Sequence, residues 1–412
     1  MKWLSSDKIE PLPKAIKTGI KVAFINNEKR IHTGMHTGAA QINRLIARAL
    51  AQLGVQVRHF YPRHKLSETP VRLYGIANIL FFYTLLEHKD QILKFDIIQG
   101  TTYTPLPFLA FDIPIVCHFG STVQGYLNAV PPTEKLLKEE RKIFKELVKL
   151  DIIPELDLKT FRPMEDIADI EIVTASGATT CIATSKIVQR ELVNMGIPIE
   201  KVPVIHNAIE DYWFEFQREV VIKEPHIVFL GRLGNDVFTL KLKGFSRLVN
   251  LYRAFPDIPK TTVCMTTNKK LKEWLRVSFP KHSMYVNLRK DIIPSALAPL
   301  FGSILFLSSR YEGFSLSLIE GMSQGLVPVS FSVGVAPEII RNGENGFIVS
   351  TEKEAEMRVR ELLADNDKRI TMAKEAKKTA EQFRSNTISS ELLSLYRHIK
   401  NEHKQKNKIS TI

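Results

Sequence analysis

Cysteine is scarce in this sequence. Its 412 residues include three cysteines, which lie far apart and among apolar residues, at Cys117, Cys181 and Cys264. Disulfide frameworks usually need an even number of cysteines and an oxidising compartment. The odd number, the wide spacing and the apolar surroundings argue against such a framework and predict buried thiols in a reducing compartment.

The sequence also lacks a long apolar run. Its best apolar stretch, residues 73–86, has 14 residues and includes Asn78. A membrane-spanning helix needs about 20 residues. The opening segment, MKWLSSDKIEPLPK, brings charges and prolines before any apolar region forms, so it does not resemble a secretory signal. These absences predict a cytoplasmic protein, and they leave open a peripheral position on the inner face of the plasma membrane.

The residues that are present have the composition of a globular protein with two or three domains. Hydrophobic residues make up 44% and charged residues 25%, which excludes a disordered or fibrous class. The formal net charge of +13 fits three kinds of partner: nucleic acid, an anionic membrane surface or polyanionic small substrates. Charge alone does not choose among them.

Residues 133–150, TEKLLKEERKIFKELVKL, have the pattern of an amphipathic helix. The apolar residues of its single stripe are Leu136, Leu137, Ile143, Phe144, Leu147 and Val148. This pattern favours a helix that packs on a core and exposes its charges to solvent. Contact with a membrane is the open alternative, because basic amphipathic helices favour anionic headgroups.

Short β-rich runs alternate with helical patterns along nearly the whole chain, which is typical of βαβ units and parallel sheets. The alternation breaks near residues 209–223, so we expect two doubly wound α/β domains with a ligand in the cleft between them. A helix is expected at 39–53, ended by Gly54. The expected strands are 20–25, 55–61, 96–99, 113–117, 180–183, 202–205, 226–230, 262–265, 284–286, 304–307, 327–331 and 346–349.

Two cations follow the first strand of the second half, in HIVFLGRLGNDVFTLKLKGFSRLV. Arg232 stands at the end of the strand, and Lys243 precedes Gly244 and a helix. The planar fork of an arginine and the point charge of a lysine together suit a diphosphate. Lys241 is a rival for the phosphate role, and Lys243 is preferred because glycine follows it. A lone arginine is more often a surface residue, so the prediction depends on the combination with other residues.

Residues 309–322, SRYEGFSLSLIEGM, supply the rest of the combination. They follow a predicted buried strand and lead into a helix from Leu316, whose free N–H groups attract phosphate. Glu312 in the loop and Glu320 in the helix can accept hydrogen bonds from hydroxyl groups. These groups suit a ligand that has phosphates in the middle and hydroxylated rings at both ends. A sugar nucleotide has this shape. The simpler interpretation is a capping box formed by Ser317 and Glu320.

The segment SSRYEGFSLSLIEGMSQGLVPVSFSVGVAPEIIRNGENGFIV resembles the donor-binding signature of the retaining GT-B glycosyltransferases of family GT4. Its E-x7-E pair matches Glu312 and Glu320. GRL…KG around Arg232 and Lys243 is similar to the diphosphate clamp of that family. ATSKIVQRELVNMGIPIEKVPVIHNAIE and the glycine loop GMHTG at 34–38 resemble two further family segments, in the expected order.

The resemblance implies a GT-B fold, in which two Rossmann-like, doubly wound parallel-sheet domains face a central cleft. Residues 1–215 are the expected acceptor domain and residues 216–385 the expected donor domain. Residues 386–412 form a C-terminal helix and basic tail, and this helix can pack back on the first domain.

The resemblance also implies roles for single residues. Arg232 and Lys243 hold the donor diphosphate, and Glu320 accepts hydrogen bonds from the ribose. Glu312 engages the transferred sugar, and His118 lies beside that sugar. The expected catalytic residues are His118, Glu312, Arg232 and Lys243. The expected substrate-binding residues are Gly34, Gly38, Gly313, Phe314, Ser315, Leu316 and Glu320.

Some positions depart from the family pattern. In HNAIE, Ala208 and Glu210 replace the usual glycine and aspartate, so no donor contact is carried over to Asn207. Val335 stands where glycine is common. No metal site and no cofactor are expected, because the D-x-D segment 365–367 lies in a polar turn between helices.

The expected reaction transfers a sugar from a nucleotide-diphosphate sugar to a hydroxyl of a saccharide or lipid-linked acceptor, with retention at the anomeric carbon. Surface polysaccharide or glycolipid synthesis is the expected setting. A sugar-nucleotide epimerase or phosphorylase of the same fold is the alternative among enzymes. From other classes, a catalytically silent binding module stays open. A nucleic-acid binder is not expected, since no helix-turn-helix, zinc ligand set or aromatic-basic interleaving is present.

Overall fold

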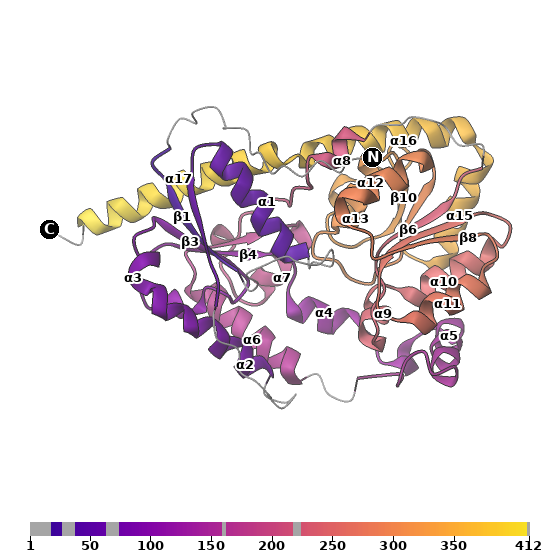
Figure 1. The fold of residues 1–412 in the computed structure, drawn as a ribbon, viewed down its shortest axis with the longest axis horizontal. Coiled ribbons are helices and arrows are strands. Elements are labelled where there is room, and N and C mark those ends of the chain that lie inside the picture. The colour runs from indigo at the N-terminus through magenta and orange to yellow at the C-terminus, as the bar shows by residue number, and fades with distance from the viewer. Residues whose placement is uncertain (1–17, 27–37, 63–73, 159–161, 217–223, 410–412) are drawn as a thin grey trace, which may run out of the picture.

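The computed structural model contains two parallel sheets flanked by helices (Figure 1). It describes residues 18–26, 38–62, 74–158, 162–216 and 224–409. In these residues, no helix combines the length and the apolar character that crossing a membrane requires. The three cysteines are buried and free, as predicted.

The first sheet has five parallel strands in the order β2-β1-β3-β4-β5. The strands are β1 (Lys21–Ile25), β2 (Gln56–Phe60), β3 (Ile97–Thr101), β4 (Ile115–Phe119) and β5 (Thr180–Ala183). Its helices are α1 (Gly38–Gln52), α2 (Tyr74–Tyr83), α3 (Lys89–Ile92), α4 (Val123–Ala129), α6 (Arg162–Gly177) and α7 (Lys186–Asn194). The β4 strand is buried along its whole length, as expected for a parallel sheet that is covered on both faces.

The second sheet has six parallel strands in the order β11-β10-β9-β6-β7-β8. The strands are β6 (Ile227–Arg232), β7 (Lys260–Met265), β8 (His282–Val286), β9 (Ile304–Leu307), β10 (Val327–Phe331) and β11 (Phe347–Val349). Its helices are α8 (Tyr212–Glu215), α9 (Val237–Leu242), α10 (Phe245–Ala254), α11 (Lys269–Ser278), α12 (Ile293–Leu297), α13 (Leu316–Ser323), α14 (Ala336–Ile339), α15 (Glu352–Ala364) and α16 (Asn366–Ala380).

The strand orders confirm the predicted α/β fold with two doubly wound sheets. In the second sheet, β7 and β8 lie on one side of β6, and β9, β10 and β11 lie on the other. This is the Rossmann arrangement, and the winding reverses between β6 and β9. Ligands of such sheets bind beyond the carboxyl ends of the strands at this reversal. The topology therefore directs attention to the loops that follow β6 and β9.

The strand predicted at 202–205 is wrong. The segment makes a single bridge, between Ala183 and Val204, and does not continue as a ladder. Pro203 has no N–H group to donate, which limits the segment to isolated pairing at the edge of the first sheet. The other predicted strands are confirmed to within two residues at each end.

The C-terminal helix α17 (Ser385–Ile409) returns to the first domain, as Figure 1 shows along the top of the molecule. Its Tyr396 is fully buried in one apolar cluster with Val22 and Ile46 of the first domain. The Tyr396 hydroxyl donates a hydrogen bond to Gln99 Oε1 of β3. Lys400 forms an ion pair of 2.8 Å with Asp96. This helix therefore ties the end of the chain to the first sheet.

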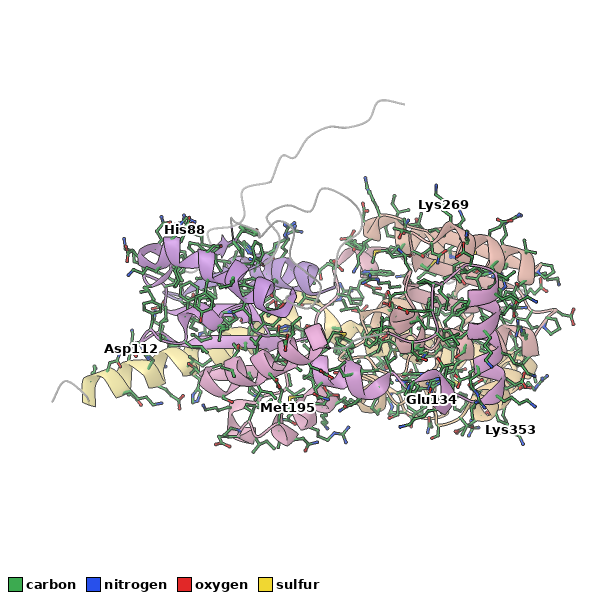
Figure 2. All side chains as sticks on the ribbon, turned by 90° about the horizontal axis from the view of Figure 1, so that it is seen from below. His88, Asp112, Glu134, Met195, Lys269 and Lys353 are labelled. Atoms are coloured by element: carbon green, nitrogen blue, oxygen red, sulfur yellow. The ribbon has the colours of Figure 1, made fainter. Side chains whose placement is uncertain are left out.

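A second segment also joins the two domains, from the first half of the chain to the second domain, and we call it the crossing segment. The segment 133–158 contains a short 3-10 turn (Thr133–Lys135) and α5 (Lys138–Lys149). Ile143, Phe144 and Leu147 of α5 are fully buried in the same core as the residues of α10. Figure 1 shows α5 beside α10 and α11, and Figure 2 places Glu134 on the lobe that carries Lys353. This part of the predicted first domain thus packs on the second.

The packing of α5 bears on the two interpretations of its sequence. Its apolar face is covered by the second domain, which favours a helix packed on a core with its charges in solvent. Leu137 is the exception to the predicted stripe: it precedes the helix and is 65% exposed. An interaction of α5 with an anionic surface would thus depend on its basic side chains, not on its apolar face.

We predict that Phe144→Ala will destabilise the protein by about 3–5 kcal/mol, because it removes a fully buried aromatic side chain and leaves a cavity. Leu137→Ala is the matched control and should change the free energy of unfolding by less than about 0.5 kcal/mol. Urea denaturation monitored by circular dichroism measures both. Equal, small effects of the two substitutions would show that α5 is not docked on the second domain.

Candidate active site

A cavity of about 660 Å³ lies between the two domains, at the carboxyl ends of β4 and β6 and beside the loop that follows β9. From the first domain it is lined by Ile42, Thr101, Thr102, His118, Gly120, Ser121, Tyr126, Met164 and Asn207. The second domain contributes, among others, Gly231, Arg232, Lys243, Met265, Lys290 and the run from Glu312 to Ser317, together with Glu320. Its position matches the reversal point of the second sheet.

The cavity brings together nine of the eleven residues that the sequence predicted for the site. They are His118, Arg232, Lys243, Glu312, Gly313, Phe314, Ser315, Leu316 and Glu320. Gly38 is the first residue of α1 and is not among the residues that line the cavity, although Ile42 of the same helix is. Gly34 lies outside the described residues.

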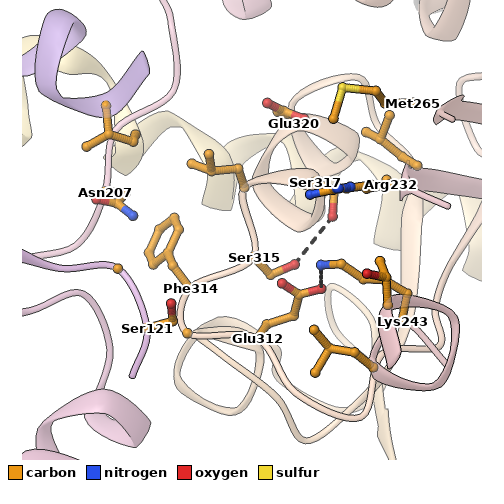
Figure 3. A pocket seen from close by; sticks show the side chains of 18 of the residues that line it. Ser121, Asn207, Arg232, Lys243, Met265, Glu312, Phe314, Ser315, Ser317 and Glu320 are labelled. Atoms are coloured by element: carbon orange, nitrogen blue, oxygen red, sulfur yellow. Dashed lines mark hydrogen bonds and ion pairs between the residues drawn. The ribbon is translucent and has the colours of Figure 1, made fainter. Parts of the chain in front are cut away.

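Lys243 and Glu312 form an ion pair of 2.7 Å across the wall of the cavity (Figure 3). The Ser309 hydroxyl donates a second hydrogen bond of 2.7 Å to the same carboxylate oxygen, Oε1. Gly244 makes this approach possible. It has a φ of 62°, and a Cβ there would lie 1.8 Å from the carbonyl oxygen of Ser308. The glycine after Lys243 therefore lets the lysine reach the loop that follows β9.

Lys241, the rival for the phosphate role, points elsewhere. Its ammonium group is buried, donates a hydrogen bond of 2.9 Å to Thr133 Oγ1 and pairs with Asp157 of the crossing segment. Lys241 does not line the cavity that contains Arg232 and Lys243. The geometry thus leaves Lys243 as the lysine that faces a ligand in this cavity.

Arg232 and the start of α13 complete the cationic side of the cavity. Arg232 is the last residue of β6 and is exposed to the cavity. In Figure 3 it reaches toward Ser317, in the first turn of α13. Ser315 precedes this helix with a φ of 81°, and its side chain does not cap the helix. Among the described residues no side chain caps this helix, and the Leu318 N–H donates a hydrogen bond of 3.2 Å to the Ser315 carbonyl. The N–H groups of Leu316 and Ser317 are thus available to an anion.

The left-handed conformation of Ser315 is strained for a residue with a side chain. Glycine adopts such a φ freely, whereas other residues do so at a cost of about 1–3 kcal/mol. Conformations of this kind persist where the surrounding structure enforces them, and they cluster at ligand sites. Here the conformation lets the chain turn sharply from the loop into α13.

The capping-box interpretation of Ser317 and Glu320 is wrong. The helix α13 begins at Leu316, so Ser317 lies inside its first turn, where its hydroxyl is 3.4 Å from that of Ser315. Glu320 is 6% exposed, and its Oε1 has no hydrogen-bond partner among the described residues. Lys290 lies 3.6 Å from that oxygen. Glu320 therefore presents an unused acceptor in the cavity.

Burial raises the pKa of Glu320, because the ionised carboxylate loses water. The nearby Lys290 offsets part of this increase in pKa, and the charge of Glu210 adds to it. The ion pair with Lys290 is long, and a buried carboxylate oxygen that receives no hydrogen bond of ordinary length is costly unless a ligand donates one. A ligand with hydroxyl groups would meet this requirement.

His118 stands near the end of β4 and is buried. Burial lowers its pKa to about 4, since the imidazolium form is poorly solvated there. A hydrogen bond with the Asn207 side chain offsets part of this decrease in pKa, and no described residue donates a hydrogen bond to Asn207 Oδ1. At neutral pH, His118 is therefore an uncharged hydrogen-bonding group in the wall of the cavity.

Sequence reasoning missed several residues of the cavity. The departure of HNAIE from the family pattern predicts no donor contact at Asn207, yet Asn207 lines the cavity and is buried. Lys290, Ser121 and Tyr126 also line it. Lys290 begins a short 3-10 turn (Lys290–Ile292) after β8, and no spacing in the sequence connects it to Glu320. Of these four residues, only Asn207 lies in a segment that resembles the family, VIHN, so only Asn207 could have been predicted from the sequence.

The segment 365–367 has a different role. Asp365 accepts a hydrogen bond of 2.9 Å from the backbone N–H of Lys368 and caps the start of α16. It does not line the cavity. Within the described residues, no group of three or more His, Cys, Asp or Glu side chains is arranged to hold a metal ion.

Curated relatives match parts of this chain. N-acetyl-alpha-D-glucosaminyl L-malate synthase of Bacillus anthracis is 30% identical over 112 residues, which are 26% of this chain and 29% of that protein. GDP-Man:Man(3)GlcNAc(2)-PP-Dol alpha-1,2-mannosyltransferase of Dictyostelium discoideum is 29% identical over 101 residues, 24% of this chain and 20% of that protein. A protein from the cps region of Klebsiella pneumoniae is 25% identical over 44% of this chain and 51% of its own length. The chain thus matches about half or less of each relative.

Solved structures match nearly the whole chain in fold. Sucrose-phosphate synthase from Thermosynechococcus elongatus has a TM-score of 0.70 at 14% identity, covering 92% of this chain and 99% of that one. Anabaena HepE in complex with UDP-glucose has a TM-score of 0.63 at 16% identity, covering 92% of this chain and all of that one. At such identities the likeness concerns the fold.

Family models describe both halves of the chain. The model of Glycosyltransferase Family 4 matches residues 36–211, and that of Glycosyl transferases group 1 matches residues 216–379. The first covers the side of the cavity that holds His118, and the second covers the side that holds Arg232, Lys243 and the two glutamates. Sequence, fold and cavity therefore agree that the chain belongs to the GT4-type glycosyltransferases and has the GT-B fold.

Proposed function

We propose that the protein transfers a sugar from a nucleotide-diphosphate sugar to a hydroxyl of a saccharide or lipid-linked acceptor, with retention at the anomeric carbon. The observation that carries this proposal is the convergence of two cations, an uncapped helix start and two glutamates in one cavity. The complex of HepE with UDP-glucose, a protein of the same fold, supports a sugar nucleotide as the donor.

The diphosphate is assigned to Arg232, Lys243 and the N–H groups at the start of α13. Negative charge grows on the leaving diphosphate as the glycosidic bond breaks. Fixed cations and dipoles that meet this charge lower the barrier. Lys243 has three N–H donors, so it can hold Glu312 and a phosphate oxygen at the same time.

The ribose is assigned to Glu320. Its Oε1, which has the long ion pair with Lys290 but no hydrogen bond among the described residues, accepts a hydrogen bond from a ribose hydroxyl and so loses the cost of lacking a donor. Given the diphosphate between Arg232 and Lys243, the base then lies toward the ends of β7 and β8, where Met265, Leu288 and Lys290 line the cavity.

The transferred sugar is assigned to the space between Glu312 and His118. Glu312 already holds the Lys243 ammonium group and the Ser309 hydroxyl, so its carboxylate is stabilised and is a poor nucleophile. In this proposal it positions sugar hydroxyls, and the acceptor attacks from the face that the diphosphate leaves. The neutral imidazole of His118 hydrogen-bonds to the sugar without adding charge.

The acceptor class is proposed from the relatives. The name of the Dictyostelium relative includes a diphospho-dolichol acceptor, and the Klebsiella relative belongs to a cps region. Both support a saccharide or lipid-linked acceptor in surface polysaccharide or glycolipid synthesis. The family matches describe transferases and do not favour the epimerase or phosphorylase alternative.

A donor screen tests the function. The purified protein is incubated with UDP-, GDP-, ADP- and TDP-sugars, with and without a panel of saccharide and polyprenyl-diphosphate acceptors, and nucleoside diphosphate release is measured. We expect release from one donor only when an acceptor is present. An isomerised donor would identify an epimerase, and phosphate-dependent release of a sugar phosphate would identify a phosphorylase.

We predict that Glu320→Gln will weaken binding of the donor nucleotide at least tenfold, because the amide is a poorer acceptor for ribose hydroxyls than a carboxylate. Isothermal titration with the nucleoside diphosphate measures the affinity. Glu344→Gln, at an exposed position outside the cavity, is the matched control. If both variants bind the nucleotide as the wild type does, Glu320 does not contact the ribose.

We predict that Lys243→Met will lower kcat by a factor of about 10² to 10³, the usual cost of losing one charge-stabilising donor. Lys269→Met, on the exposed surface of α11, is the control and should keep full turnover. Steady-state kinetics with the donor found in the screen give the comparison. Full turnover by Lys243→Met would remove this lysine from the diphosphate site.

We predict a pH-dependent contribution of His118 to stability. Because its folded-state pKa is about 4, below the ordinary 6.5, the unfolded chain takes up a proton in this range and the folded chain does not. The contribution is therefore present above pH 6.5 and is lost as the pH falls toward 4, by up to about 3 kcal/mol. Urea unfolding of the wild type and of His118→Gln at several pH values measures the difference. A constant difference would contradict a neutral, buried imidazole.

A further inference from the structure

The residue before Glu312 makes contacts with the opposite domain. Tyr311 follows β9 of the second domain, and its side chain is buried against α4 and α7 of the first. Its hydroxyl accepts a hydrogen bond of 3.2 Å from the backbone N–H of Thr122. It also donates one of 2.7 Å to Glu191 Oε2. One side chain of the loop after β9 (residues 308–315), which we call the donor loop, thus contacts two helices of the first domain.

The carboxylate of Glu191 accepts hydrogen bonds from hydroxyl groups of both domains. The Thr122 hydroxyl donates a hydrogen bond of 2.7 Å to the same Oε2 that receives the Tyr311 proton. Thr122 is also the N-cap of α4, where its Oγ1 accepts a hydrogen bond of 2.9 Å from Gly125 N–H. The Tyr311 hydroxyl therefore touches both the capping residue of α4 and the acid that holds it.

The contact surface of α4 is shaped for this tyrosine. A Cβ on Gly125 would lie 2.4 Å from the Tyr311 hydroxyl oxygen, so a larger residue would displace the ring. The Tyr126 ring meets the Tyr311 ring edge-on, with 5.1 Å between the centroids. Val130 and Phe238 join Tyr311 in a small apolar cluster between the domains. Hydrogen bonds and apolar packing therefore both hold the Tyr311 side chain against α4.

These contacts reach the candidate active site directly. Tyr126 lines the cavity, and its hydroxyl is hydrogen-bonded to that of Ser121, which also lines it, at 2.7 Å. The backbones of Gly120 and Gly313 approach so closely that a Cβ on Gly313 would lie 1.9 Å from Gly120 oxygen. The Ser185 hydroxyl donates a hydrogen bond of 2.5 Å to the Gly313 carbonyl. The donor loop and the first-domain wall therefore form one continuous contact.

We propose that Tyr311 is a positioning residue that latches α4 of the first domain onto the donor loop of the second. The latch holds His118, Ser121 and Tyr126 at the distance from Glu312 that the transfer step requires. This inference rests on the proposed function for its effect on turnover. The contact of Tyr311 with Thr122 and Glu191 does not depend on the identity of the donor.

The two-domain arrangement predicts which kinetic constant the latch controls. The side chains assigned to the nucleotide, Arg232, Lys243 and Glu320, all belong to the second domain. The nucleotide can therefore bind when the latch is broken. The reacting end of the donor needs both walls of the cavity, so loss of the latch lowers kcat while leaving nucleotide affinity nearly unchanged.

Tyr311→Phe tests the latch, because it removes the hydroxyl and keeps the ring that packs on Tyr126. We expect kcat to fall at least tenfold and the dissociation constant of the nucleoside diphosphate to stay within about twofold. Small-angle X-ray scattering should show a larger radius of gyration for this variant. Tyr285→Phe is the matched control: Tyr285 is 40% exposed on β8, does not line the cavity and should leave all three quantities unchanged.

A double substitution tests whether the hydroxyl acts through Glu191. If it does, Tyr311→Phe combined with Glu191→Ala should lower kcat no further than the stronger single variant, because both remove one interaction. Unchanged turnover and scattering in Tyr311→Phe would overturn the proposal, as would losses of nucleotide affinity and turnover by equal factors. If the wild type binds no nucleotide, the proposed function fails, and the scattering comparison still decides whether Tyr311 holds the domains together.

Discussion

The ion pair between Lys243 and Glu312 is the interaction on which the candidate active site depends. It joins the end of α9, in the segment that follows β6, to the loop after β9, and so connects the segments that leave the two strands at which the second sheet reverses its winding. The pair forms because Gly244 lets the two backbones approach at the Ser308 carbonyl. It also affects the electrostatics of the site, since the ammonium group offsets the charge of a carboxylate that would otherwise repel an anion in the cavity.

Around this pair, the two sides of the cavity provide different chemistry. The second domain supplies Arg232, Lys243 and the uncapped start of α13, all of which favour a negatively charged group. The first domain supplies His118, which burial keeps neutral, together with hydroxyl and amide side chains. Glu320 also belongs to the second domain but is a buried hydrogen-bond acceptor. A ligand that is charged in the middle and hydroxylated at its ends satisfies these groups at once.

The domains are held to each other because each half of the chain contributes a helix that packs on the domain formed by the other half. The helix α5 leaves the first half of the chain and completes the core of the second domain, and α17 returns from the second half to cover the first sheet. Tyr311 adds a contact at the cavity itself. Because α5 and α17 join the two domains away from the cavity, the positions of its two walls depend on packing that lies outside the site.

The sequence by itself determined the α/β class, nearly every strand and the charged residues of the second domain. Strand periodicity, the segment that holds Arg232 and Lys243, and the segment that holds Glu312 and Glu320 are each local, and local properties leave a readable pattern. Only the tertiary structure decided that Lys241 pairs with Asp157 while Lys243 faces the cavity, that Ser317 and Glu320 form no capping box, and that Asn207 and Lys290 line the site. The same holds for the docking of α5 and for Tyr311, whose partner Thr122 lies 189 residues away. Contacts of this kind are set by how distant elements pack, and no periodicity along the chain records them.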